Sequence, residues 1–237
     1  MAQIDPNFAK FLLRSMNDFE DYGVHLLFND WWETAPDDVI EKYVQAIEQH
    51  PEQGPLAAEG WYAEPPELAR LEACAPGSFG EGYYRFVVDN GLEARLGAGY
   101  RELHEQKMAL GKLERMPAVL QYKVLRGYQT HDLHHVLTGY DVTPEGEHAL
   151  QVFGLAQMSY PYAAMWVAVV AAHMTLVNPD LIGPAMDAIC DGWAYGKRAR
   201  NIQLVKFELQ LDRPLREVQA EYGLRDRPTQ AALALAA

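Results

Sequence analysis

The feature that most constrains this chain is an uncharged apolar segment: residues 148–179 contain no Asp, Glu, Lys or Arg. A segment of this length is long enough to suggest a membrane-spanning helix. However, Gln151 and His173 place polar groups within it. Pro161 in addition predicts a break into two helices, each of which is short for a span. We therefore expect two central helices that are buried in a helical domain.

Apolar residues at helical spacing predict several helices before this segment. One is expected over residues 7–29, and a second begins at the capping sequence 34–37 and ends before Pro51. Residues 51–65 are rich in Pro and Gly, which predicts a loop. Further helices are expected over 66–72, after a capping Ser78, over 99–112 and over 117–138.

The chain after the apolar segment also has a helical pattern. Gly183-Pro184 opens one helix, and Pro214 begins a last one that Gly223 ends. Residues 205–212 alternate apolar and polar side chains, which predicts an extended segment, although no partner strand is evident. The sequence thus predicts an all-α protein, folded as a single multi-helix domain around central apolar helices.

Composition narrows the classes of partner. The net charge of −13 repels nucleic acid and anionic lipid heads, so any membrane contact is expected to be apolar. Cys74 and Cys190 form no CxxC pair, which suits a reducing compartment. The first residues lack the basic and apolar regions of a secretory signal and the Arg-rich character of a transit peptide. We expect a cytoplasmic protein of bacterial type.

Residues 131–147 contain the side chains that best suit chemistry. If residues 131–138 are helical, His135 lies roughly 40° and Asp132 roughly 100° around the helix from His131, so the three share one face. His134 lies on the other side of His131 and is left out of the site. Two imidazoles four residues apart on a helix are a common way to hold a divalent metal, and a carboxylate in the same arc adds a third donor.

A second element would complete this site. Thr143 and Pro144 predict a new helix start, and Glu147 near that start would fold back towards His131 and His135. The sequence therefore predicts a metal site at a helix–loop–helix. Such a mixed nitrogen and oxygen donor set suits zinc, iron(II), manganese or cobalt, with open positions for water or substrate.

Spacing alone leaves alternatives open. A pair of histidines in an HxxxH pattern is equally compatible with a structural role. His-Asp pairs also serve metal-dependent phosphohydrolases, but these need a further upstream His and a later Asp, for which only His104 and Asp187 are available. Arg126, about one turn before His131, could bind an anionic head group or pair with an acid.

The pattern His131-Asp132-x-x-His135, eleven residues and Glu147 resembles the HDxxH-x11-E motif of the coenzyme Q biosynthesis protein 4 family. Two further stretches are similar to the family, so the likeness covers about residues 54–224. Tyr128 stands where the family carries a second arginine, and residues 97–120 do not align clearly. The two further stretches are Pro76-Gly77-Ser78-Phe79-Gly80 with Tyr83 and Phe86, and Phe207-Glu208 followed by Leu215-Arg216 and Tyr222-Gly223-Leu224.

The resemblance implies a protein of ubiquinone (coenzyme Q) biosynthesis that removes the ring carboxylate of a prenylated hydroxybenzoate-type intermediate by oxidation. It assigns a divalent metal, zinc foremost, to His131, Asp132, His135 and Glu147. Asp132 would be a fourth ligand or would orient a histidine, and it is the candidate catalytic residue.

The resemblance also implies partners. We expect the ligand to be a prenylated quinone precursor or another isoprenoid lipid, bound near Arg126 and Tyr128 and along the apolar wall 149–177. The expected protein partners are other ubiquinone-biosynthesis proteins and a second copy of the chain in a homodimer. The protein would be peripheral to the inner face of the cell membrane. A non-catalytic lipid-binding scaffold is the alternative. The expected organisation is N-terminal helices over 1–53, a family domain over 54–224 that is continuous with them, and a flexible tail over 225–237.

Overall fold

The computed structural model describes residues 3–19, 21–96, 105, 109, 111 and 113–225. These residues form helices joined by loops, with no strand among them, which confirms the predicted all-α single domain. The helices are α1 (Pro6–Asn17), α2 (Val24–Trp31), α3 (Asp37–Glu48), α4 (Gln53–Glu59), α5 (Leu68–Glu72), α6 (Phe79–Asp89), α7 (Glu93–Leu96), α9 (Ala118–Thr138), α10 (Pro144–Gln157), α11 (Pro161–Leu176), α12 (Ile182–Arg198) and α13 (Leu215–Glu221), with the 3₁₀ helices η1 (Pro179–Leu181) and η2 (Phe207–Gln210).

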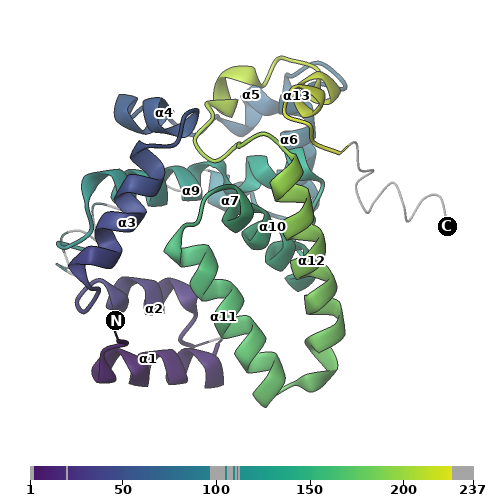
Figure 1. The fold of residues 1–237 in the computed structure, drawn as a ribbon. Coiled ribbons are helices and arrows are strands. Elements are labelled where there is room, and N and C mark those ends of the chain that lie inside the picture. Colours follow the sequence, from purple (N-terminus) through teal and green to yellow (C-terminus); the bar gives the residue numbers. More distant parts are fainter. Residues whose placement is uncertain are drawn as a thin grey trace.

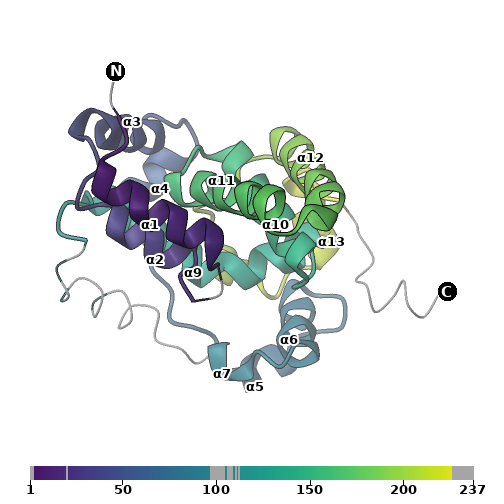
Figure 2. The same cartoon turned by 90° about the horizontal axis from the view of Figure 1, so that it is seen from below.

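The helices gather on both sides of α9 and α10. α5, α6 and α13 share one apolar core with α9, α10 and α12, whereas α1 and α2 pack against α11. Figure 1 shows α11 and α12 running side by side to a common turn at one end of the molecule. Seen from below, α1 and α2 lie together beside α11 (Figure 2).

Small residues let α10 and α12 approach closely. A Cβ added at Gly192 would overlap the carbonyl oxygen of Ala149, and one added at Gly196 would overlap that of Phe153. Phe153 and Tyr195 then fill the space between the two helices, with ring centroids 4.9 Å apart. The close contact fixes α10, which carries one of the predicted metal ligands.

The uncharged segment forms two helices, because Pro161 begins α11 where the sequence predicts the break. The inner face of α10 is buried, as expected. α11 is less covered than expected, and apolar side chains are exposed around its junction with α12. No helix in the described ranges has both the length and the apolar character needed to cross a lipid bilayer.

Three predicted elements are wrong. The expected helix over 7–29 is divided into α1 and α2, because Asp18 leaves the helical conformation and its side chain accepts a hydrogen bond from the Asp21 amide, which competes with helix continuation. The expected loop over 51–65 contains α4, in which Gly54 allows a close approach to the end of α3. The expected extended segment over 205–212 contains η2.

The predicted boundaries at Ser78 and Gly223 are confirmed, whereas the helix start predicted at Thr34 is shifted. Ser78 caps α6 by accepting a hydrogen bond from the Glu81 amide at 3.1 Å, and Gly223 follows α13 with φ 66°. Pro36, rather than Thr34, is the residue before α3. The helix expected over 99–112 and the tail after 225 lie outside the described residues, apart from a few single positions.

Candidate metal centre

A tight turn brings the end of α9 to the start of α10. Gly139 ends α9 in the left-handed conformation, with φ 74°, which glycine adopts without strain. Thr143 then caps α10 by accepting a hydrogen bond from the Gly146 amide at 3.1 Å, and Pro144 occupies the first turn. Glu147 therefore sits one turn into α10 and faces the last turns of α9, as the sequence predicts.

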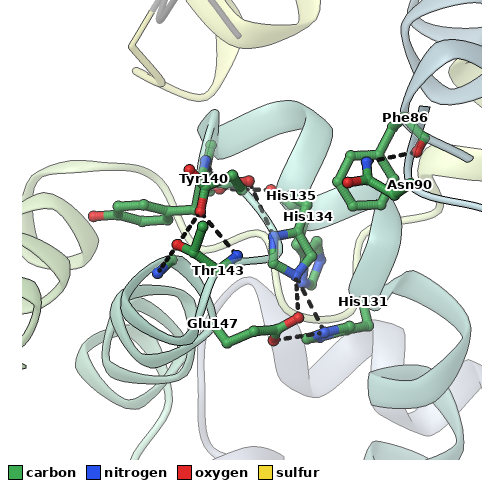
Figure 3. A network of polar contacts seen from close by, with 11 residues as sticks. Phe86, Asn90, His131, His134, His135, Tyr140, Thr143 and Glu147 are labelled. Atoms are coloured by element: carbon green, nitrogen blue, oxygen red, sulfur yellow. Dashed lines mark hydrogen bonds and ion pairs between the residues drawn. The ribbon is translucent and has the colours of Figure 1, made fainter. Parts of the chain in front are cut away.

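Three side chains converge at this junction (Figure 3). The Nε2 atom of His131 lies 3.1 Å from Oε2 of Glu147, and Nε2 of His135 lies 3.3 Å from Oε1 of the same carboxylate. The two Nε2 atoms are 3.2 Å apart. Two imidazole nitrogens and a carboxylate thus point at one another rather than out to solvent.

The surroundings hold these groups in place. His135 is buried, its ring stacks on Phe86 at 5.3 Å, and its Nδ1 donates to the carbonyl oxygen of Tyr140 at 3.0 Å. That hydrogen bond directs the lone pair of Nε2 towards the site, which is the usual arrangement of a metal-binding histidine. Burial opposes ionisation of Glu147, but the two imidazoles of His131 and His135 beside it outweigh burial, so the pKa of the carboxyl lies well below its usual range.

The donor set fits a divalent cation. Two ligands each about 2.0–2.1 Å from a tetrahedral ion lie about 3.3 Å apart, and the three measured separations are 3.1, 3.2 and 3.3 Å. Imidazole and carboxylate together are the ligands of zinc, iron(II) and related ions. His131, His135 and Glu147 could therefore hold an ion without large rearrangement, leaving further coordination positions for water or substrate.

A cavity of about 530 Å³ opens beside the three groups. Part of its wall is apolar and largely aromatic, and is made by Phe28, Val124, Leu150, Tyr162, Ala163 and Trp166. The polar part of its wall includes Lys123, Tyr128, His131, Asp132, Glu147, Gln151 and Gln203. The cavity therefore suits an amphipathic molecule whose polar end faces the three convergent side chains.

Comparison with known proteins decides the family. The sequence model of the family described as "Coenzyme Q (ubiquinone) biosynthesis protein Coq4" matches residues 63–228, which is most of the chain. The chain belongs to the Coq4 family.

The chain is also similar to one curated protein and to one solved structure. "Ubiquinone biosynthesis protein COQ4 homolog, mitochondrial" of Danio rerio is 24% identical over 164 residues, which are 68% of this chain and 55% of that protein. The chain thus spans about half the length of this curated relative. A crystal structure of a protein from Nostoc punctiforme PCC 73102 superposes with a TM-score of 0.70 at 23% identity, and the match covers 91% of this chain and 94% of that one. This likeness supports the fold.

The structure separates the residues of the Coq4-like motif. His131, His135 and Glu147 form a group whose ligand atoms all lie within 4.8 Å of one another, and Asp132 is not a member of that group. Asp132 instead lines the cavity, because the next position on the helix turns its side chain away from the arc that faces α10. Its roles as a fourth ligand and as a catalytic residue stay predictions.

Arg126 pairs with an acid, which is one of the two roles open from the sequence. It is fully buried, and its guanidinium donates to Glu208 at 2.7 and 3.2 Å and to the carbonyl oxygen of Val205 at 3.0 Å. This ion pair ties α9 to η2, and it gives a structural reason for the Phe207-Glu208 part of the family resemblance. Tyr128 lines the cavity, as a substrate-binding residue would. Binding of substrate by Arg126 or Tyr128 stays a prediction.

Of the two residues that a phosphohydrolase would need, the structure describes only Asp187. Asp187 is not part of the convergent group, and His104 lies outside the described residues.

Lys123 lines the cavity but is not among the site residues that the sequence predicts. Its position could have been found, because Lys123, Gly127 and His131 follow one another at four-residue steps and therefore share a helix face.

Proposed function

We propose that this protein acts in ubiquinone biosynthesis on a prenylated hydroxybenzoate-type intermediate and takes part in the oxidative removal of its ring carboxylate. Family membership supports the pathway. The observation that carries the proposal further is that the convergent group and the amphipathic cavity share one wall: His131 and Glu147 belong to both. A phenolic ring at the polar end and an isoprenoid tail along the aromatic wall would match this distribution of side chains.

In the proposed reaction the bond between the ring and its carboxyl group breaks, carbon dioxide leaves, and a hydroxyl derived from water takes its place on the ring. Two electrons and two protons pass to an oxidant; dioxygen, the simplest, would become hydrogen peroxide. A divalent metal held by His131, His135 and Glu147, zinc foremost and iron, cobalt or manganese as alternatives, would supply a Lewis acid that polarises a phenolate or a bound water. The hydrogen bond from His135 to Tyr140 keeps that imidazole in the tautomer that can serve as a ligand.

The aromatic wall has its own part in this proposal. Phe28, Tyr162 and Trp166 offer apolar surface to the isoprenoid tail and exclude water from the ring. The phenol of the half-buried Tyr162 stays neutral, because desolvation raises its pKa above the ordinary value. The tail would therefore enter between α9, α10 and α11 without displacing a charge.

The proposal includes contact with the cytoplasmic surface of the cell membrane. Large apolar side chains are exposed where α11 turns into α12, among them Leu176 at 74% and Val177 at 52%. Leu181 and Ile182 extend the same turn. With a net charge of −13, the chain would meet a bilayer through apolar contact rather than through attraction to anionic lipid.

Binding to vesicles tests this contact. Replacing Leu176 and Val177 together by Ser should reduce co-sedimentation of the protein with phosphatidylcholine vesicles, because it removes apolar surface from the turn. Leu209→Ser is the matched control, since Leu209 is also exposed, at 69%, but lies in η2. Equal binding by both variants would refute the assignment of this turn.

The expected homodimer and the expected association with other biosynthetic proteins remain part of the proposal. Sedimentation analysis of the purified protein measures whether it forms the homodimer.

Mass spectrometry of quinone intermediates in a strain that lacks the gene tests the function most broadly. The deletion should accumulate a prenylated hydroxybenzoate, and the wild-type gene should remove it. His135→Ala should not restore the pathway, whereas Glu145→Gln, which changes an exposed acid on the same helix as Glu147, should restore it.

The same experiment separates the enzyme from its alternative. Full restoration by His135→Ala would point to the non-catalytic isoprenoid-binding scaffold. A deletion strain with unchanged quinone intermediates would refute the role in ubiquinone biosynthesis altogether.

A further inference from the structure

Lys123 is a buried cation that has no anionic partner among the residues that the structure describes. Its side chain is only 7% exposed, yet it lines the cavity beside the convergent group. Within the described part of the chain it makes no hydrogen bond and no ion pair. The face of the Tyr160 ring lies near the amine, with its centroid 5.4 Å from Nζ. Buried charges are normally paired, so this amine calls for an anionic partner that the described residues do not provide.

The neighbours of Lys123 increase this imbalance. Arg126, one turn later on α9, disfavours the charged form of Lys123 further, and Glu208 does not compensate Lys123 because it is engaged by both terminal nitrogens of the Arg126 guanidinium. Tyr160 donates its hydroxyl to the carbonyl oxygen of Leu120 at 3.1 Å, and burial raises the pKa of this phenol, so it stays neutral. This part of the cavity wall therefore attracts anions.

The amine is directed towards the candidate metal centre. A Cβ built at Gly127 would lie 3.8 Å from Nζ of Lys123, and no other side chain or remote backbone atom would lie within 4 Å of it. The Lys123 side chain thus reaches forward along α9 over Gly127, which lines the cavity and leaves the path open. His131 is one further turn along the same face, where successive Cβ positions are roughly 6 Å apart. A single substituted benzene ring can span this interval.

We propose that Lys123 binds the carboxylate of the ring, while the opposite, phenolic end of the ring faces His131 and Glu147. This inference rests on the proposed substrate class and adds the residue that selects an acid over the corresponding phenol. It makes Lys123 a specificity-determining residue, because it would hold the group that the reaction removes and would release the decarboxylated product from that contact.

A matched pair of ligands tests the inference. 3-Geranyl-4-hydroxybenzoate and 2-geranylphenol differ only in the carboxylate, and binding of each to the purified full chain can be followed by calorimetry. The wild-type protein should bind the acid about tenfold or more tightly than the phenol, as expected for a charge-assisted hydrogen bond. Lys123→Met should lose this preference by weakening only the binding of the acid, and Lys123→Arg should retain much of it.

Controls keep the outcomes distinct. Lys42→Met removes an exposed lysine on α3 and should behave as the wild type. Retention of the acid preference in Lys123→Met, or equal binding of both ligands by the wild-type protein, would overturn the role of Lys123 while leaving the proposed cavity intact. The wild-type comparison does not depend on the folding of any variant. Failure of the wild-type protein to bind either ligand would overturn both this inference and the proposed substrate class.

Discussion

Lys123 should lower the stability of the folded protein at neutral pH, and its replacement by Met should raise it. Burial, with a smaller contribution from Arg126, lowers the pKa of the Lys123 ammonium from the ordinary 10.5 to about 8. A difference of one pKa unit corresponds to about 1.4 kcal/mol, so holding this charge in the folded state costs about 3 kcal/mol. Met has a similar length and no charge to bury, so Lys123→Met should regain most of that energy.

The stability difference between the wild-type protein and Lys123→Met should depend on pH. Below about pH 8, Lys123 is protonated in both the folded and the unfolded chain, and the full cost is present. Between about pH 8 and 10.5 the folded chain loses the proton first, so the wild-type protein becomes more stable relative to the variant. The free-energy difference should therefore be largest at neutral pH and should shrink towards zero as the pH approaches 10.5.

Urea unfolding followed by circular dichroism measures both effects. The midpoint for Lys123→Met should exceed that of the wild type at about pH 7, and the difference should be much smaller at about pH 10. Lys42→Met, on the exposed surface, should shift the free energy of unfolding by less than about 0.5 kcal/mol at either pH. A variant that is no more stable than the wild type at neutral pH, or a gain independent of pH, would refute the view that Lys123 is buried without an anionic partner.

Two further substitutions test the packing that supports the site. Glu208→Ala should destabilise the protein by about 3–5 kcal/mol, because it leaves the fully buried Arg126 without its counter-ion, and thermal or urea unfolding measures the loss. Gly192→Ala should cost about 1–3 kcal/mol because its methyl group would overlap the Ala149 carbonyl. Gly183→Ala, on the same helix but facing open space, should be neutral or stabilise by up to about 1 kcal/mol, and equal effects at both glycines would contradict the packing of α10 on α12.

Much of the fold follows from local signals in the sequence. Pro161 and Pro144 begin α11 and α10 as predicted, Ser78 and Thr143 cap their helices, and Gly139 ends α9. Each of these residues acts within one helical turn, so its effect can be read without knowledge of the tertiary structure.

The elements that were predicted wrongly depend on contacts distant in sequence. The residues of η2 alternate in polarity, but their conformation is set by burial of Phe207 in the main core and by the ion pair from Glu208 to Arg126. α4 contains Gly and Pro, which predict a loop, yet it packs on α9 and donates from Gln53 to the carbonyl oxygen of Asn201 at 3.0 Å. Tertiary packing overrides local preference at both places.

The candidate site likewise has features that follow from local spacing and features that depend on the folded structure. Helical spacing places His131 and His135 together, and the capping sequence of α10 brings Glu147 to them. The position of Lys123 shares this periodicity, but the absence of an acidic partner for it among the described residues depends on the helices that pack around it and could not be inferred from spacing. The pairing of Arg126 with Glu208, 82 residues later, likewise required the folded structure.

The central claim is that His131, His135 and Glu147 hold one divalent metal ion. Elemental measurement of the purified protein, after exposure to zinc, iron(II), cobalt or manganese and removal of unbound ions, tests it most directly. The wild-type protein and the control Glu145→Gln should each retain about one ion per chain, whereas Glu147→Gln and His135→Ala should retain almost none. Equal metal content in the wild type and in both site variants would contradict the claim.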